Sequence, residues 1–207
     1  VYFELDAAGT LVEMGQKDLG VDVNCLDVGS LSTGRARSLF LAVGGYDSSV
    51  RILGLAPGEG RLVELASMQV SAIAESLAFA EMAMEVGATT AAPSAGSAST
   101  VVSDGGGECP GGEAAATRIF LNVGLQSGVL QRAAVDATSG ALSDTRLRFL
   151  GSRPVKLFRV AQAGVGDQAV LALSSRSWLV YALQGHYFTT PLSYDALDHA
   201  CGFSSEQ

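Results

Sequence analysis

The chain has 207 residues, a hydrophobic fraction of 48% and a formal charge of −8, which predicts a folded acidic protein with ample material for a core. A surface of this charge repels a phosphate backbone, so we do not expect these residues alone to bind nucleic acid. No apolar run approaches the roughly 20 residues of a membrane span and no signal peptide opens the sequence, so no membrane association is expected.

Short apolar segments separated by turn residues fill the first 70 positions, which predicts β-strands. The expected strand segments are residues 1–5, 11–13, 22–28, 39–55 and 62–70, with a polar loop at 30–37. Gly9 supplies a positive φ for the first turn. Residues 22–28 are expected to form an inner strand, and residues 62–70 to close the same sheet. Because the chain opens within a strand-like VYFEL run, we expect it to be part of a longer protein.

Residues 76–84 are compatible with two kinds of secondary structure. Ala, Glu and Met favour a helix, and all three are frequent here. The segment nevertheless occupies the position in the repeat that residues 22–28 occupy earlier. We therefore predict a strand.

Residues 86–116 have a different composition from the rest of the chain. Of these 31 residues, 24 are Gly, Ala, Ser, Thr or Pro, with no aromatic residue and no alternation. Such a segment buries too little surface to offset its ordering entropy, which predicts a disordered insertion between propeller segments 1–85 and 117–207 of one domain. Its DGGGECPGGE core lacks the Lys-Ser/Thr of a phosphate-binding loop. An alternative interpretation is that the segment is a tether that can be modified at Ser94, Ser97, Ser99 or Ser103.

Residues 118–158 predict three antiparallel strands in succession. The strands are expected at 119–123, 129–135 and 142–150, and the turns between them at 124–128 and 136–140. The absence of a helical period between these strands is typical of a propeller blade.

The same hairpin pattern recurs along the chain at residues 39–53, 120–131 and 170–183. Val43 and Val123 are 80 positions apart, and Val123 and Leu173 are 50 apart, so removing the insertion leaves a period near fifty. This period suits a four-stranded blade. We predict an all-β, WD-repeat-like β-propeller, represented here by about four blades of an incomplete propeller.

Five of the chain's 13 basic residues lie within 14 positions, and they are our candidate partner-binding residues: Arg146, Arg148, Arg153, Lys156 and Arg159. Alternation predicts that Arg146 and Arg148 share the solvent face of a strand, while Leu147 and Phe149 face the next blade. The simplest interpretation is a solvated strand face that guards against edge pairing. The alternative is a surface for an acidic protein, or for a passing RNA backbone, with protein favoured because Arg forks match carboxylates. Residues 151–154 are expected to link two blades.

Few other residues point to chemistry. Cys25, Cys109 and Cys201 have neither disulfide nor zinc-site spacing, so we expect packed thiols at strand positions for Cys25 and Cys201, and a bystander for Cys109. His186 and His199 lack a convincing nucleophile and carboxylate. Trp178 is expected to pack within a blade with its N–H hydrogen-bonded. We therefore predict no catalytic residues, metal or cofactor.

Four segments resemble the family of large propeller subunits represented in the splicing factor 3b complex by subunit 3. They are LNVGLQSGVL (121–130), LSDTRLRFLGSRPVKLFRV (142–160), SSRSWLVY (174–181) and TPLSYDALDHACGFSSEQ (190–207). The runs VYFELDAAGTL and FLAVGGYDSSVRIL resemble it too. The wider family includes the large damaged-DNA-binding subunit and the largest cleavage and polyadenylation specificity factor subunit, but GSRPVKLF and the continuous C-terminal likeness point to the splicing branch. Residues 86–116 depart from the family, whose connection there is shorter and more charged.

The resemblance implies a noncatalytic nuclear scaffold. Family members carry three propellers and a C-terminal helical domain, and this chain resembles part of the middle propeller. The implied partners are the HEAT-repeat subunit and a very small subunit of the splicing factor 3b complex, within the U2 particle, with indirect association with pre-mRNA and U2 RNA. Those surfaces lie largely on the outer propellers, so few partner-binding residues are expected here.

Two alternatives stay open. A propeller enzyme of the lactonase type has turns similar to VDATSGALSD at 135–144, but it requires carboxylates or histidines that converge at the channel mouth. A sister-family scaffold would act instead in mRNA 3′-end processing or ubiquitin ligation.

Overall fold

A computed structural model describes residues 1–29, 37–55, 62–84, 116–161 and 168–201, and all the regular secondary structure in these ranges is β-strand. The strands are β1 (Tyr2–Leu5), β2 (Leu11–Gly15), β3 (Val23–Val28), β4 (Phe40–Gly45), β5 (Ser49–Gly54), β6 (Glu64–Gln69), β7 (Ala74–Met84), β8 (Ala116–Leu125), β9 (Val129–Val135), β10 (Leu142–Phe149), β11 (Lys156–Ala161), β12 (Gln168–Leu173), β13 (Ser177–Leu183) and β14 (His186–Pro191).

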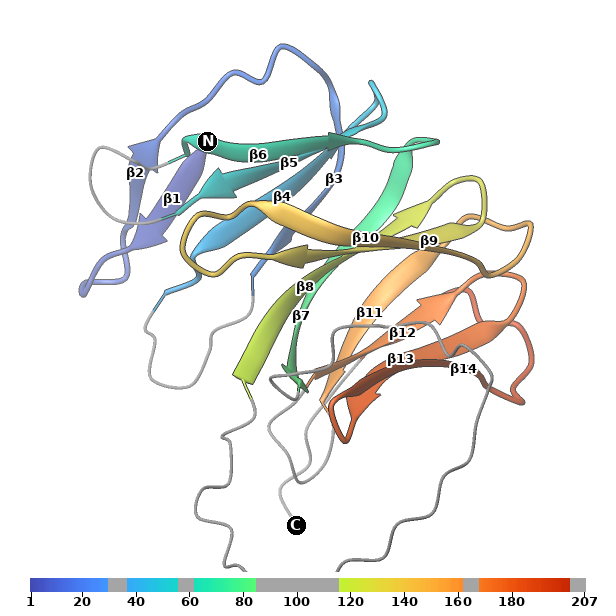
Figure 1. The fold of residues 1–207 in the computed structure, drawn as a ribbon. Coiled ribbons are helices and arrows are strands. Elements are labelled where there is room, and N and C mark those ends of the chain that lie inside the picture. The colour runs from blue at the N-terminus through green and yellow to red at the C-terminus, as the bar shows by residue number, and fades with distance from the viewer. Residues whose placement is uncertain (30–36, 56–61, 85–115, 162–167, 202–207) are drawn as a thin grey trace, which may run out of the picture.

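The strands form three four-stranded antiparallel sheets and one two-stranded sheet (Figure 1). The sheets are β1-β2, β3-β4-β5-β6, β7-β8-β9-β10 and β11-β12-β13-β14, each in chain order. The first strands of the three larger sheets, β3, β7 and β11, are the inner strands, and β7 contacts both of the others. Consecutive meanders that meet at their first strands are blades of a propeller, so the predicted all-β, partial propeller is confirmed.

Most of the predicted strands lie where the sequence placed them. The segment that was compatible with a helix is strand β7, and it pairs with β8 from Ala74↔Leu125 to Met84↔Ala116. This ladder joins the two sides of the predicted insertion in one sheet. The insertion itself lies outside the described residues, except for Ala116, where β8 begins. The predicted polar loop also lies outside them, except for Arg37.

Two hydrophobic cores lie on the two faces of the β7–β10 blade. Phe79, Leu121 and Val123 pack with Ile52 and Val50 of the β3–β6 blade. Residues of opposite parity in β7 and β8 form the second core with the β11–β14 blade, and its members include Met82, Phe120, Val170 and Val180. From Phe120 to Leu125 both faces of β8 are buried, and apart from Asn122 they carry no polar side chain, which differs from the alternation of a half-exposed strand.

Backbone approaches backbone where the β8–β9 turn meets the link between two blades. The Val155 N–H donates to the Leu125 carbonyl (3.1 Å), and the Leu150 N–H donates to the Gly128 carbonyl (2.9 Å). Gly128 has a φ of +81°, and a Cβ there would lie 1.7 Å from the Gly151 carbonyl oxygen. Glycine is therefore required at position 128 both for its backbone conformation and for the space it leaves.

Asp27 ties the three inner strands together. One of its carboxylate oxygens accepts a hydrogen bond from the Phe79 N–H of β7 (2.8 Å), and the other accepts one from the Arg159 guanidinium of β11 (3.0 Å). Arg159 also donates to the Val28 carbonyl (3.1 Å). Burial raises the pKa of Asp27 above its usual range, although the Phe79 N–H and the Arg159 charge act to lower it. The edge N–H of β7 is thus satisfied by a side chain of the neighbouring blade.

Replacing Gly128 with Ala will open the contact between the β8–β9 turn and the blade link. We expect a loss of about 3 kcal/mol of local stability, since the new Cβ adds a clash to the strained φ. Hydrogen exchange of the full-length protein would show roughly 100-fold faster exchange at residues 125–155. Gly9→Ala is the matched control, because Gly9 has a similar φ of +78° with nothing within 4 Å, and it should cost only about 1–2 kcal/mol. Equal effects of the two substitutions would contradict the steric argument.

The ion pair between Asp27 and Arg159 predicts a pH-dependent effect of Arg159→Met. Because folding raises the pKa of Asp27, the stability it contributes is fully present below an unfolded pKa of about 3.9 and is lost as pH rises through the folded pKa. Without the Arg159 charge the folded-state pKa of Asp27 should rise further, so more stability should be lost as the carboxyl ionises. The variant should therefore be destabilised by about 1 kcal/mol more at pH 7 than at pH 4. Protection factors of peptides that cover β7 measure this difference. In an Asp27→Asn background the pH dependence of the Arg159 effect should vanish, and its persistence there would refute the assignment.

Candidate partner-binding site

The five basic residues singled out in the sequence lie at three separate places. Arg146 and Arg148 are on β10, Arg153 and Lys156 flank the start of β11, and Arg159 is further along β11. They therefore form no single continuous basic surface, and each place has its own set of contacts.

On β10 the predicted alternation is present, but the environments of the two faces differ from those predicted. Arg148 lies opposite Leu130, which belongs to the core shared with the β11–β14 blade, and its guanidinium lies over the Trp178 ring at 5.2 Å. It therefore faces the next blade. Leu147 and Phe149 lie opposite Gln131 and Val129, which contact the β3–β6 blade, so the apolar pair is on that other side; it is 64% and 66% exposed. Both arginines are exposed and share one face of the strand, as predicted. The expectation that Leu147 and Phe149 face the next blade was wrong, because the pairing with β9 places them on the opposite side.

A bulge in β10 positions a carboxylate beside Arg146. The register between β10 and β9 shifts between Ser143 and Arg146, and Asp144 has a φ of +43°. The Asp144 carboxylate accepts a hydrogen bond from the Arg146 Nε at 2.8 Å. Arg132, opposite Arg146 on β9, lies 3.9 Å from the same carboxylate.

Arg132 is the principal site residue that the sequence analysis did not identify. Its side chain is only 13% exposed, and its guanidinium lies 3.6 Å from the centre of the Tyr187 ring and 5.0 Å from that of Phe120. Such cation–π contacts are strengthened when the cation is desolvated. The available signal was an arginine in the apolar run VLQRAAV, which is unusual for a strand buried on both faces.

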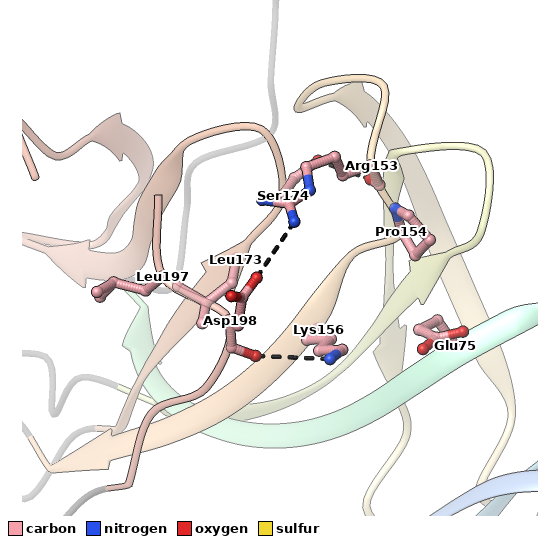
Figure 2. Close-up of a pocket in the computed structure, with 8 residues that line it drawn as sticks. All are labelled: Glu75, Arg153, Pro154, Lys156, Leu173, Ser174, Leu197 and Asp198. Carbon is pink, nitrogen blue, oxygen red and sulfur yellow. Dashed lines mark hydrogen bonds and ion pairs between the residues drawn. The ribbon is translucent and has the colours of Figure 1, made fainter. Parts of the chain in front are cut away.

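A pocket of about 270 Å³ lies beside the link between the second and third four-stranded blades, and two of the predicted residues line it (Figure 2). The Arg153 guanidinium pairs with the Asp198 carboxylate at 3.2 Å, and Lys156 Nζ donates to the Asp198 carbonyl at 3.5 Å. Glu75 and Pro154 line the opposite side. The Asp198 side chain is 82% exposed, so this pair is weak, and solvent or another carboxylate can compete with it.

The link between these two blades, at residues 151–154, is held in place by hydrogen bonds from the β12–β13 turn. Ser174 Oγ donates to the Arg153 carbonyl at 2.7 Å, and the Ser152 N–H donates to Ser175 Oγ at 3.0 Å. The Trp178 N–H donates to the Leu150 carbonyl at 3.2 Å, which confirms the expected packing role of this residue. The backbone that carries Arg153 and Lys156 is therefore fixed.

The remaining chemistry-bearing residues have structural surroundings. Burial, followed by the nearby Glu75 charge, raises the pKa of the Cys25 thiol to about 11, and this thiol donates to the Ala74 carbonyl. Cys201 is exposed and lies outside any strand, so the packed position expected for it was wrong. Cys109 lies outside the described residues. His199 packs edge-on against Phe158 at 5.0 Å.

Within the described ranges, no three His, Cys, Asp or Glu residues are placed to hold a metal ion. Nor does that part of the chain contain a helix with the length and apolar character needed to cross a membrane.

Comparison with known proteins matches the whole chain to one family. Residues 1–207 match the family described as the RSE1/DDB1/CPSF1 second beta-propeller. Spliceosome-associated protein 130 A of Arabidopsis thaliana and splicing factor 3B subunit 3 of Danio rerio are each 43% identical to the chain over 208 residues. Pre-mRNA-splicing factor rse1 of Emericella nidulans is 43% identical over 211 residues.

These relatives are much longer than the chain. Each alignment covers 100% of the chain but only 15% of the relative. The match spans all the described strands, the basic residues of β10 and β11 among them. The chain therefore belongs to the RSE1/DDB1/CPSF1 second beta-propeller family, with whole-length similarity to its splicing factor 3B subunit 3 and Rse1 members.

Proposed function

We propose that these residues belong to a noncatalytic propeller scaffold subunit of the splicing factor 3b complex, in the U2 small nuclear ribonucleoprotein, that supports pre-mRNA splicing. The observation that carries this proposal is 43% identity, along the full 207 residues, to relatives named as splicing factors. Because the chain spans only 15% of those relatives, the partners of the whole protein are part of the proposal.

The proposed partners are the HEAT-repeat subunit and the small subunit of the complex, and the proposed location is the nucleus. Association with pre-mRNA and U2 RNA is proposed to be indirect. The charge of −8 supports this, since a surface that is acidic on average disfavours direct contact with a phosphate backbone.

A scaffold must hold its surfaces in fixed relative positions, and the contacts between blades suit that task. Cores on both faces of the β7–β10 blade, the Asp27 tie and the backbone contacts at Gly128 each join neighbouring blades. Local openings of such a body have a high free energy, because several contacts must break together.

We also propose that Arg153 and Lys156 bind an acidic segment of a protein partner. Their pocket already holds the Asp198 carboxylate, which is the kind of group that such a partner offers. A carboxylate of the partner would replace the exposed carboxylate of Asp198, so little further desolvation is needed.

Residues 1–85 and 117–207 are proposed to form one domain, interrupted by a disordered insertion at 86–116. Supporting this, β7 and β8 flank the insertion and pair with each other along their whole length. The composition of residues 86–116 supports the second half of the proposal.

Affinity purification tests the proposed function. The tagged full-length protein, recovered from nuclear extract, should carry the HEAT-repeat subunit, the small subunit and U2 small nuclear RNA. Mass spectrometry and RNA probing measure these components. Recovery of cleavage-factor or ubiquitin-ligase subunits in their place would refute the assignment to splicing. Recovery of no stable partner would favour the lactonase-type alternative, which a rise in melting temperature with a divalent metal or a sugar lactone would support.

The proposed site at Arg153 and Lys156 has a separate test. Arg153→Glu with Lys156→Glu should lower the yield of at least one protein partner at physiological salt, while the propeller keeps its hydrogen-exchange protection. Arg176→Glu is the control, since Arg176 is exposed in the β12–β13 turn and does not line this pocket. Unchanged yields of every partner would rule out a binding role for the pair.

A further inference from the structure

A groove of about 310 Å³ lies between the outer strands of two neighbouring blades. Its walls come from β9 and β10 on one side and from β14 on the other, and the residues that line it are Leu130, Arg132, Arg146, Leu147, Arg148, Tyr187 and Thr189. Three of these seven residues are arginines and none is acidic. The groove is thus locally basic on a chain with a charge of −8.

The guanidinium of Arg132 is held in place at the base of this groove. It lies against the Tyr187 ring, and the Tyr187 hydroxyl donates to Asn122 Oδ1 at 2.9 Å. Asn122 is fully buried and in turn donates to the Ala78 carbonyl at 3.3 Å. A chain of buried contacts therefore runs from the inner strand β7 to the arginine, and it fixes the cation before any ligand arrives.

The charge of Arg132 is incompletely compensated by the described residues. Its Nε is buried and has no hydrogen-bond partner among them, and the Asp144 carboxylate lies 3.9 Å from its terminal nitrogen. A buried donor without a partner is destabilising, and more so when the group is charged. A second carboxylate in the groove would reduce this cost by compensating the guanidinium charge.

We propose that the groove between β10 and β14 binds the carboxylates of an acidic peptide segment from a protein partner, through Arg132, Arg146 and Arg148. Guanidinium groups bind carboxylates through two parallel hydrogen bonds, and three of them converge here. The Thr189 side chain supplies a further polar group on the β14 side. The identification of the ligand as a protein rests on the proposed scaffold function.

The same geometry disfavours single-stranded RNA as the occupant. Proteins bind unpaired bases by stacking them on exposed aromatic or guanidinium faces, in a groove that follows several nucleotides. Here the Tyr187 ring is covered by Arg132, and the Trp178 ring by Arg148. A volume of about 310 Å³ suits one or two side chains better than a stacked run of bases.

Fluorescence anisotropy with the full-length protein tests the proposal. The probe is a labelled decapeptide rich in Glu and Asp, and its control is the same peptide with Gln and Asn at those positions. We expect the acidic peptide to bind at least tenfold more tightly, and its affinity to fall as salt is raised. Arg146→Glu with Arg148→Glu should weaken binding at least tenfold.

Three further variants make the test specific. Arg176→Glu, again the control, makes one such Arg→Glu change on the neighbouring blade outside the groove and should leave binding unchanged. Arg148→Lys should retain part of the affinity, because it keeps the charge but loses the planar fork. Arg132→Lys should weaken binding even though its net charge is conserved. Hydrogen exchange at β9 and β14 verifies that each variant is folded.

Equal binding of the acidic and neutral peptides would overturn the proposal, as would an unchanged affinity in the folded double variant. Tighter binding of a single-stranded RNA oligonucleotide that displaces the peptide would overturn it in favour of a nucleic-acid site. The result of this peptide-binding assay is independent of which complex the affinity purification recovers. Peptide binding together with recovery of the wrong complex would refute only the splicing assignment, whereas loss of peptide binding together with recovery of the splicing subunits would refute only the groove.

Discussion

Burial of the β7–β10 blade on both of its faces is the constraint on which the other features of the structure depend. Phe79 and Leu121 pack toward one neighbouring blade, while Met82 and Phe120 pack toward the other. A sheet placed in this way cannot use one polar face to satisfy its buried polar groups. Its inner edge and its turns must therefore find hydrogen-bond partners in the adjacent blades, and Asp27 and residues 150–155 supply them.

The strands were predictable because their signal is local. Apolar segments, turn residues and a hairpin that recurs near every fifty positions are read from neighbouring residues, and the repeat identified β7 against the helix propensity of its Ala, Glu and Met. The link at residues 151–154 was predictable for the same reason, since Gly151 and Pro154 mark it.

The site was less predictable, because it depends on which strand lies beside which. The alternation along β10 was evident, but only the pairing with β9 shows that Arg148 faces Trp178 and that Leu147 faces the other blade. Arg132 and Tyr187 are 55 positions apart, and no local pattern relates them. The Arg159–Asp27 pair spans 132 positions and joins the first inner strand to the last. The five basic residues between positions 146 and 159 are close in sequence, but the fold places them at three separate sites.

Some arginines of this acidic chain are paired with carboxylates, and others lie over aromatic rings. This difference bears on which arginines a partner can bind. The Arg159 guanidinium donates hydrogen bonds to the Asp27 carboxylate and the Val28 carbonyl of the β3–β6 blade, so its positive charge is already paired within the structure. Arg132 and Arg148 instead lie over aromatic rings, which hold a guanidinium in place without neutralising it. A cation fixed against a ring keeps its attraction for an anion, whereas a cation that is fully paired has little left. The groove between β10 and β14 thus combines preorganisation with residual positive charge, and both properties favour the recognition of an anionic group.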